Sequence, residues 1–258
     1  MNTHLFDLHG KTAVVLGGTS GIGRAIAVGL AKAHADVIAT SRRIPEVEQT
    51  AREIETLGRR TLAVPVDVLD RKSLETPQDE VLGTFGRIDI LVNCAGITYR
   101  TPTLECTEDE WNRIIETNLT GTLRACQIFG KTMVAQRYGR IVNIASLGTF
   151  VAFHEVAAYC ASKAAVGSLT KSLAVELAQY GVCVNAIAPG IFPTALNEDL
   201  LDKTERGREL QIRIPMKRFG KTDELVGAAI FLASEAASYL TGQILAVDGG
   251  YLASGVNQ

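Results

Sequence analysis

The sequence KTAVVLGGTSGIG, residues 11–23, determines how this chain of 258 residues must be organised. Its first half, Lys11–Leu16, is a short β-branched apolar run, typical of a strand buried on both faces. Its second half is rich in glycine, and Arg24–His34 follows with the Ala and Leu pattern of a helix. Glycines between a strand and a helix let the backbone approach a pyrophosphate, which the helix N-terminus then binds. The glycines can also form only a tight turn, but this context favours dinucleotide binding.

The residues after the second strand bear on the choice of dinucleotide. Asp36–Thr40 is a second buried strand, and Ser41, Arg42 and Arg43 follow it. A unit that binds NAD usually places an acid here, on the ribose 2′-hydroxyl. A hydroxyl and two guanidinium groups instead favour the 2′-phosphate of NADP(H), with NAD(H) as the alternative. The arginines can equally be solvated residues at the start of a helix over 45–57.

The remaining strands predict the fold class. Further short apolar runs are found at 61–66, 88–92, 139–145, 182–187 and 243–247. They alternate with helical segments, which predicts an α/β fold with a doubly wound parallel sheet of about seven strands and helices on both faces. No linker or internal repeat is visible, so residues 1–258 are expected to form a single domain. Pro77 is expected to kink the helix over 70–85 or to start a new turn.

Composition and charge exclude several classes of protein. The net charge is −2 and the pI is near 6.1, which gives no reason to expect binding to nucleic acid. The start of the chain lacks the layout of a signal peptide, and no apolar run is long enough for a membrane span. The five cysteines show no C-x-x-C spacing and the four histidines form no ligand pattern. We therefore expect a cytoplasmic protein with reduced thiols and no metal site.

Tyr159 and Lys163 form a candidate proton-transfer pair. They are four residues apart in a segment, Ala157–Tyr180, that is rich in Ala, Leu and Lys and contains no proline. In a helix both side chains lie on one face. A nearby cation favours the phenolate and lowers the pKa of a tyrosine from about 10, so that the tyrosine can donate and accept a proton near neutral pH. By itself the pair can also be a coincidence on one helix face.

Taken in order, these motifs resemble the short-chain dehydrogenase/reductase family in its single-domain form. The resemblance covers Lys11 to Gly250 and implies a Rossmann fold. The matching pieces are the glycine loop 17–23, Asp67, Asn93-x-Ala95-Gly96, Asn118, Ser146, Tyr159-x-x-x-Lys163, Pro189-Gly190 and Thr194. The sequence departs from the family at Leu16 and Cys94, where Thr and a second Asn are usual.

The resemblance implies a role for each catalytic residue. Tyr159 would protonate the carbonyl oxygen in reduction and accept the proton in oxidation. Lys163 would bind the nicotinamide ribose and lower the pKa of Tyr159. Ser146 would bind the substrate oxygen, and Asn118 would anchor a water that links Lys163 to solvent. Hydride moves between the nicotinamide and the carbonyl carbon.

The resemblance also implies the residues that bind the cofactor, with Asp67 and Val68 at the adenine and residues 187–194 at the nicotinamide. The full set is Gly17, Thr19, Ser20, Gly21, Ile22, Gly23, Ser41, Arg42, Arg43, Asp67, Val68, Asn93, Ala95, Gly96, Tyr159, Lys163, Pro189, Gly190, Ile191 and Thr194.

Substrate selection is expected in the charged segment that follows Pro189. Residues 190–220 are predicted to form a helical lid, with Gly190 and Gly220 at its ends. The stretches LFDLHGKTAVV, GIFPTALNEDLL and VDGGYLASG most resemble the gluconate 5-dehydrogenase-like members of the family. That resemblance implies a polyol, sugar acid or related keto or hydroxy substrate. The candidate substrate contacts are Ser146, Thr149, His154, Tyr159 and Phe192.

Two other functions fit parts of the sequence. A 3-oxoacyl-[acyl-carrier-protein] reductase shares the same core, but an acidic carrier protein requires a basic patch. Lys203, Arg206 and Arg208 are available, although acids are mixed with them. A non-catalytic NADP-sensing protein on this fold would have a broken catalytic set, whereas all four residues are present. The resemblance also implies a homotetramer.

Overall fold

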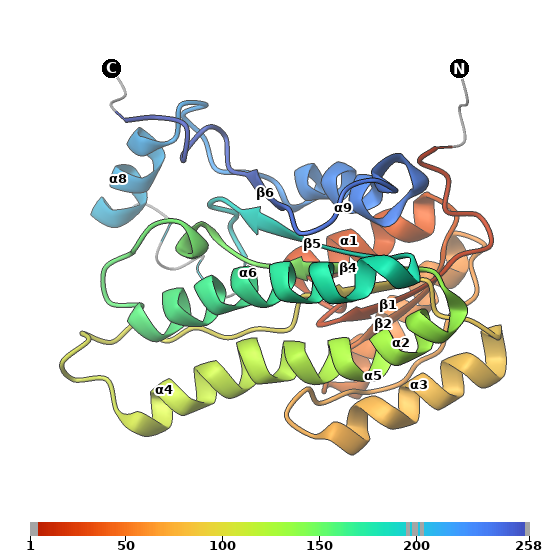
Figure 1. Cartoon of the computed structure of the whole chain (residues 1–258). Coiled ribbons are helices and arrows are strands. Elements are labelled where there is room, and N and C mark those ends of the chain that lie inside the picture. Colours follow the sequence, from red (N-terminus) through yellow and green to blue (C-terminus); the bar gives the residue numbers. More distant parts are fainter. Residues whose placement is uncertain (1–4, 195–196, 198–200, 202–203, 256–258) are drawn as a thin grey trace.

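A parallel β-sheet of six strands lies at the centre of the computed structural model, which describes residues 5–194, 197, 201 and 204–255 (Figure 1). The strand order is β2-β1-β3-β4-β5-β6, and every neighbouring pair is parallel. The strands are β1 (Thr12–Leu16), β2 (Asp36–Thr40), β3 (Ile90–Asn93), β4 (Gly139–Ile144), β5 (Val182–Pro189) and β6 (Ile244–Val247). The predicted doubly wound α/β fold is confirmed.

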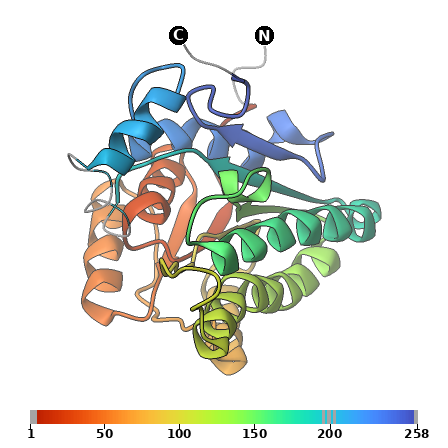
Figure 2. The ribbon, with the colours of Figure 1, turned by 90° about the vertical axis from the view of Figure 1, so that its left-hand side faces the viewer.

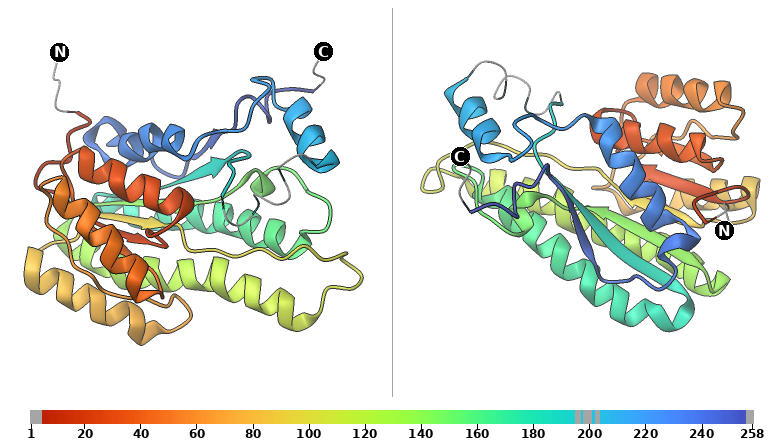
Figure 3. Two further views of the ribbon diagram at one scale, coloured as in Figure 1. Left: turned by 180° about the vertical axis from the view of Figure 1, so that it is seen from behind. Right: turned by 90° about the horizontal axis from the view of Figure 1, so that it is seen from above.

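Helices cover both faces of this sheet, as the views from the side and from behind show (Figures 2 and 3). On one face lie α1 (Gly21–Lys32), α2 (Ile44–Thr56) and α9 (Val226–Ala233). On the other lie α3 (Arg71–Phe85), α5 (Gly121–Gln136) and α6 (Ala157–Leu177). The helix α4 (Glu108–Ile115) continues into α5 through a π-helical turn, Glu116–Thr120. The remaining helix, α8 (Glu205–Arg213), stands beyond the carboxyl ends of the strands.

The last four residues of β1, Ala13–Leu16, are all apolar, and the structure shows why. Ala13 and Val15 belong to the hydrophobic cluster under α1 and α9, whereas Val14 and Leu16 belong to the cluster under α3 and α5. All four side chains are at most 1% exposed. Because successive side chains of a strand point to opposite faces, a strand between two helical layers needs apolar residues throughout.

The strand predicted at 61–66 is not formed, so the sheet has six strands rather than about seven. The segment runs along β2 and is tied to it by a backbone hydrogen bond, 2.9 Å, from the Val66 N–H to the Ser41 carbonyl. Pro65 has no N–H to give to a ladder, and prolines are tolerated in sheets only at edges or bulges. The apolar residues of 61–66 are typical of a strand, but without the Pro65 N–H the backbone does not form a regular ladder of hydrogen bonds with β2.

Pro77 does not start a new helix, because α3 runs without interruption from Arg71 to Phe85. The Asp70 side chain caps the helix by accepting a hydrogen bond, 2.9 Å, from the Lys72 N–H. A proline inside a helix costs about 3 kcal/mol through its missing hydrogen bond and its ring. Pro77 is itself buried on the inner face of α3, so packing offsets part of that cost.

The described part of the chain shows no metal or membrane feature. Among those residues there is no group of three or more His, Cys, Asp or Glu side chains that could hold a metal ion. None of their helices is both long enough and apolar enough to cross a bilayer. The five cysteines are all free thiols.

The strand order also locates the ligand crevice. The chain moves outward from β1 to β2 and then returns to the other side of β1 to form β3. In open α/β sheets, ligands bind outside the carboxyl ends of the strands at such a switch point. The glycine loop leaves β1 there, and the segment Cys94–Gly96 leaves β3 beside it.

Candidate active site

The glycine loop lies directly against the segment that follows β3. Gly17 has a φ of 74°, and a Cβ built on it would lie 2.7 Å from the backbone nitrogen of Ala95. A Cβ on Gly23 would collide with the Gly17 carbonyl oxygen. Ser20, the N-cap of α1, makes no side-chain capping bond, so the first N–H groups of the helix are available. The loop therefore has the close backbone approach and the free donors that a pyrophosphate needs.

Two buried polar atoms near this loop have no hydrogen-bond partner among the described residues. They are Thr40 Oγ1, on a residue that is 0% exposed, and Asn93 Oδ1, on a residue that is 4% exposed. Asn93 also lines a small cavity, together with Leu16, Val68, Ala95, Thr117, Gly121 and Thr122. Buried polar groups are rarely left unpaired. The orphaned atoms and the glycine cradle fit a bound dinucleotide.

The three residues after β2 are not equivalent. Arg43 is the N-cap of α2, and its Nε lies 2.9 Å from Glu46 Oε1. Ser41 Oγ accepts a hydrogen bond, 3.4 Å, from the Arg43 N–H. Arg42 is exposed and has no hydrogen bond or ion pair with any other described residue. Its guanidinium is therefore the one of the pair that is available to a phosphate.

The four predicted catalytic residues come from three separate elements. Ser146 follows β4, Tyr159 and Lys163 lie on α6, and Asn118 lies in the π-helical turn. Ser146, Asn118 and Lys163 are at most 9% exposed. The Ser146 and Tyr159 side chains are hydrogen-bonded, and Lys163 Nζ lies 5.8 Å from the centre of the Tyr159 ring. The fold thus brings together residues that are up to 45 positions apart, from 118 to 163.

Burial sets the electrostatics of this cluster. It raises the pKa of the Tyr159 phenol, and the hydrogen bond with Ser146 lowers that pKa by a smaller amount. Burial also lowers the pKa of Lys163 to about 8, because its ammonium group is desolvated. Lys163 Nζ donates a hydrogen bond, 2.7 Å, to the Ile144 carbonyl. In the protein by itself the pKa of Tyr159 therefore moves upward, opposite to the direction expected from the sequence.

The Asn118 side chain is fully engaged. Its Oδ1 accepts a hydrogen bond, 2.8 Å, from the Ile97 N–H, and its Nδ2 donates to the Ile97 carbonyl at 2.9 Å. The second Nδ2 proton goes to Ser162 Oγ at 3.1 Å. A Cβ built on Gly96 would lie 3.3 Å from Asn118 Oδ1 and 3.6 Å from Lys163 Nζ. Asn118 and Lys163 therefore face the same small space beside Gly96.

Three candidate substrate contacts have other surroundings than the sequence suggested. The Thr149 hydroxyl donates a hydrogen bond, 3.0 Å, to the Lys163 carbonyl. Phe192 is 5% exposed and belongs to the main core, where its ring packs against Gly220. The His154 side chain is 71% exposed, and its Nδ1 lies 3.5 Å from Glu155 Oε1. Thr149 thus bonds to the backbone of α6, and Phe192 packs in the core beside Gly220. The roles of Thr149, His154 and Phe192 as substrate contacts stay predictions.

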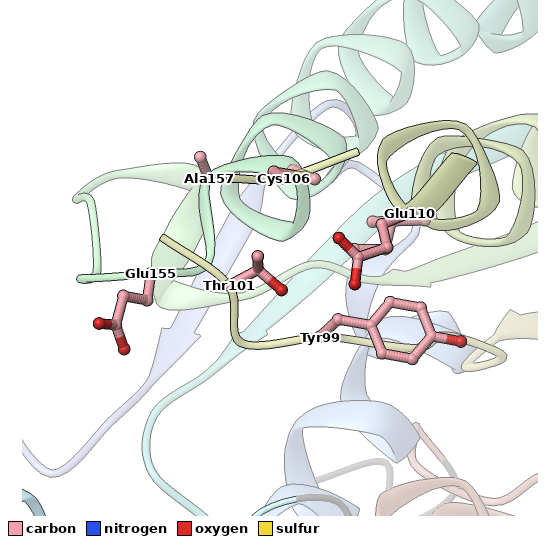
Figure 4. Close-up of a pocket in the computed structure, with 8 residues that line it drawn as sticks. Tyr99, Thr101, Cys106, Glu110, Glu155 and Ala157 are labelled. Atoms are coloured by element: carbon pink, nitrogen blue, oxygen red, sulfur yellow. The ribbon is translucent and has the colours of Figure 1, made fainter. Parts of the chain in front are cut away.

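An arginine that the sequence did not single out, Arg100, lies on the segment between β3 and α4 and pairs with Glu155. Arg100 Nε donates a hydrogen bond to Glu155 Oε2, and the Thr101 N–H donates to the Glu155 carbonyl at 2.8 Å. Glu155 has a φ of 65°, which is uncommon for a residue other than glycine. A small pocket adjoins this group and is shown in Figure 4; it is lined by Tyr99, Thr101, Cys106, Glu110, Ile114, Glu155, Ala157 and Ala158. The sequence signal was a lone arginine four residues after Gly96.

The predicted lid contains one described helix, α8. Leu210 and Ile214 at its end pack with Leu147 and Tyr251 in a small hydrophobic cluster, apart from the two clusters of the sheet. Asn197 Oδ1 accepts a hydrogen bond, 2.8 Å, from the Thr194 N–H. Residues 195–196, 198–200 and 202–203 of the predicted lid lie outside the described residues. The described part of this segment packs against Leu147, in the loop that follows Ser146.

A loop that can seat a pyrophosphate opens here onto a half-buried tyrosine paired with a serine. This combination defines an oxidoreductase that exchanges hydride with a nicotinamide dinucleotide. Comparison with known families agrees: the family model described as enoyl-(acyl carrier protein) reductase matches residues 17–252. The chain belongs to the short-chain dehydrogenase/reductase family, whose enzymes use NAD(P) and act on CH–OH groups.

Similar proteins share almost the full length of the chain. A 2-dehydro-3-deoxy-D-gluconate 5-dehydrogenase of Pseudoalteromonas atlantica is 43% identical, over 96% of this chain and 98% of its own. A structure from Beutenbergia cavernae, assigned as an NAD(P)-dependent gluconate 5-dehydrogenase with bound NADP, is 46% identical and covers 97% and 100% of the two chains with a TM-score of 0.92. A gluconate 5-dehydrogenase from Burkholderia cenocepacia, in complex with NADP and tartrate, is 38% identical and covers 97% and 98% with a TM-score of 0.94.

Proposed function

We propose that this protein interconverts a secondary hydroxyl group and a carbonyl group on a sugar acid or related polyol, with NADP(H) as its cofactor. The observation that carries the proposal is the hydrogen-bonded pair of Ser146 and Tyr159 beside Lys163. The names of the similar proteins support the sugar-acid class, because these proteins are named as dehydrogenases of gluconate and its derivatives.

Each residue of the pair has a defined task in this proposal. Ser146 Oγ donates a hydrogen bond to the substrate oxygen and holds it near Tyr159. In reduction the Tyr159 hydroxyl gives its proton to that oxygen, and in oxidation the phenolate takes the proton back. The bound cofactor supplies or accepts the hydride at the carbonyl carbon. The Lys163 ammonium stabilises the phenolate, and Asn118 holds the polar space through which protons return.

The proposed cofactor site uses the loop and the two strand ends already described. Residues 17–23 hold the pyrophosphate, with Thr19, Ser20 and Ile22 supplying donors and packing beside the glycines. Asp67 and Val68 face the adenine, and Asn93 to Gly96 face its ribose. Pro189, Gly190, Ile191 and Thr194 contact the nicotinamide side. Arg42, which is free of other described partners, binds the 2′-phosphate of NADP.

A sugar acid also needs a partner for its carboxylate. Arg100 lies on the segment that follows Ile97, whose N–H is bound by Asn118. The Arg100 side chain is 52% exposed. Its ion pair with Glu155 connects it to the loop that leads into Tyr159. Guanidinium groups bind carboxylates in two-pronged geometry. We therefore assign the carboxylate of the substrate to Arg100.

A panel of substrates tests the proposal. The purified protein is assayed with NADPH and with NADP⁺ on gluconate, 5-ketogluconate, glycerol, an acetoacetyl thioester and an enoyl thioester. Turnover of the sugar acids in preference to both thioesters is the expected result. Turnover of the acetoacetyl thioester alone would replace the proposal by 3-oxoacyl-[acyl-carrier-protein] reduction.

The structure gives the acyl-carrier alternative little support. The carrier protein is acidic and needs an unpaired basic surface near the lid. Arg206 is within 3.7 Å of Glu209, and Lys203 lies outside the described residues. The cations of the described lid are thus mixed with acids, as the sequence indicates. We rank this function second.

A homotetramer remains part of the proposal. The exposed face of α6 carries small and apolar side chains, including Ala164, Ser168 and Val175. Val175 is 81% exposed. A helix with such a face can pack closely against a copy of itself. Light scattering on the purified protein measures the assembly directly, and a monomer at assay concentration would exclude it.

A further inference from the structure

A serine hydroxyl near the start of α6 forms a hydrogen bond with Asn118 of the π-helical turn. Ser162 is 0% exposed. Its Oγ donates a hydrogen bond, 2.7 Å, to the carbonyl of Tyr159 and accepts one, 3.1 Å, from Asn118 Nδ2. The hydroxyl has one proton to give, so its orientation is determined by these two partners. Two of the four proposed catalytic residues are thus connected through Ser162.

The loss of this hydroxyl would leave Asn118 under-bonded. Asn118 is 0% exposed, so no solvent replaces a missing partner. Its Oδ1 and one Nδ2 proton are held by the backbone of Ile97, and the second Nδ2 proton has Ser162 as its partner. A buried donor without an acceptor is costly. The π-helical turn would therefore shift to find another acceptor, and Asn118 would move relative to α6.

We propose that Ser162 is a positioning residue for the proton-transfer site. It fixes the π-helical turn, and with it Asn118, at one position relative to the backbone of Tyr159. This inference rests on the proposed function, because it concerns the same site. Ser162 lies beneath the Tyr159–Lys163 face of α6, on the side turned toward Asn118, so it acts through its neighbours. Small misplacements of a catalytic group reduce rate far more than they reduce binding.

A second hydroxyl on α6 provides the matched control. Thr170 Oγ1 donates to a carbonyl of its own helix, that of Val166, at 2.8 Å, and accepts from Asn143 Nδ2 at 2.9 Å. Thr170 and Asn143 are both 0% exposed. Thr170 therefore repeats the bonding of Ser162, but it lies two turns further along the helix and contacts no proposed catalytic residue. Its removal gives the same kind of structural loss without disturbing Asn118. Asn143 Oδ1 also accepts a hydrogen bond, 2.8 Å, from Asn93 Nδ2 in the proposed cofactor site, so kcat is measured at saturating cofactor.

The experiment compares Ser162→Ala with Thr170→Val. Each variant is assayed with the panel substrate that the wild-type protein turns over fastest, so that a wrong substrate class does not affect the comparison. We expect Ser162→Ala to lower kcat by about tenfold or more, with the KM for the cofactor within about twofold of wild type. Thr170→Val should keep kcat near the wild-type value, although the thermal midpoints of both variants fall. Equal kcat values for the two variants would refute the role of Ser162.

A double-mutant cycle separates positioning from a general packing effect. If Ser162 acts through Asn118, Ser162→Ala should cost nothing further when it is added to Asn118→Ala. The double variant should then have the kcat of Asn118→Ala alone. Independent, multiplicative losses in the double variant would show that Ser162 acts by another route and would overturn the inference.

Discussion

Tyr159 depends on its neighbours because burial alone makes it a weaker acid. Burial raises its pKa, and the hydrogen bond with Ser146 acts in the other direction. Tyr159→Phe removes the proton and leaves the ring. We expect kcat to fall by about 10²- to 10⁴-fold, the usual contribution of general acid–base catalysis, while NADPH binding, measured by fluorescence, is retained. Unchanged turnover would instead indicate a protein in which this cluster is not catalytic.

Lys163 connects the site to the stability of the fold. Its pKa falls from 10.5 in the unfolded chain to about 8 in the folded protein, because its charge is buried. Between these values the unfolded chain binds more protons, so the free energy of unfolding should rise with pH from about 8 to 10.5. The rise attributable to Lys163 is of the order of 3 kcal/mol at most.

Denaturant titrations at several pH values test this dependence against Lys163→Met, which keeps most of the side-chain volume. The curve of the variant should be flatter than that of the wild type over the same pH window. Other titrating groups affect both proteins alike and cancel in the difference. Parallel curves would show that Lys163 keeps an ordinary pKa.

Arg42 and Arg43 should differ in their effect on cofactor choice. Arg43 already has Glu46 as its partner, whereas Arg42 has no described partner. A charge-assisted hydrogen bond is worth about 1.5–3 kcal/mol, so Arg42→Ala should raise the KM for NADPH by about 10- to 100-fold. The KM for NADH should change little, and Arg43→Ala should have the smaller effect on both. Steady-state kinetics with NADPH and NADH measure both KM values. An equal rise in the KM for NADH would show that Arg42 does not bind the 2′-phosphate.

Arg100 should affect acidic substrates only. Arg100→Ala is expected to raise the KM for gluconate by at least about tenfold through the lost ion pair, and to leave the KM for a neutral polyol unchanged. Arg52 is an exposed arginine that pairs with Glu48 on α2, on the opposite face of the sheet, and Arg52→Ala serves as the control. A parallel loss on acidic and neutral substrates would point to a structural role through Glu155.

At the scale of elements, the strand–loop–helix unit was predictable because its constraints are local. An apolar strand between two helical layers and a glycine at a positive φ each leave a direct mark on the sequence. The segment 61–66 shows the limit of this reasoning. It has the composition of a strand, but ladder formation depends on backbone donors, and Pro65 lacks one.

Glycine positions allow a direct test at this scale. A Cβ on Gly23 would collide with the glycine loop, whereas a Cβ on Gly227, exposed in the first turn of α9, would meet nothing within 4 Å. Gly23→Ala should therefore abolish measurable NADPH binding. Gly227→Ala should stabilise the protein by roughly 0.5–1 kcal/mol, the helix preference of alanine over glycine. Calorimetric binding and thermal unfolding measure the two effects, and cofactor binding by Gly23→Ala at wild-type affinity would contradict the structure of the loop.

At the scale of the whole molecule, the order of the catalytic residues was readable, but their connections were not. Asn118, Ser146, Tyr159 and Lys163 were predicted from a linear pattern, and the fold brings them together. The sequence did not single out Ser162 and Arg100, because the roles proposed for them depend on contacts between residues of separate elements. The packing of the Phe192 ring against Gly220 could not be predicted, because a phenylalanine in such a segment can face either the substrate or the core.

The separate hydrophobic cluster of Leu147, Leu210, Ile214 and Tyr251 has a consequence for the history of such proteins. The side chains that pack around α8 are different from those under the helices that cover the sheet. Substitutions around α8, in the segment predicted to select the substrate, therefore leave the two sheet clusters intact. A lineage with this architecture can change the compound it consumes in small steps while it inherits the same dinucleotide machinery.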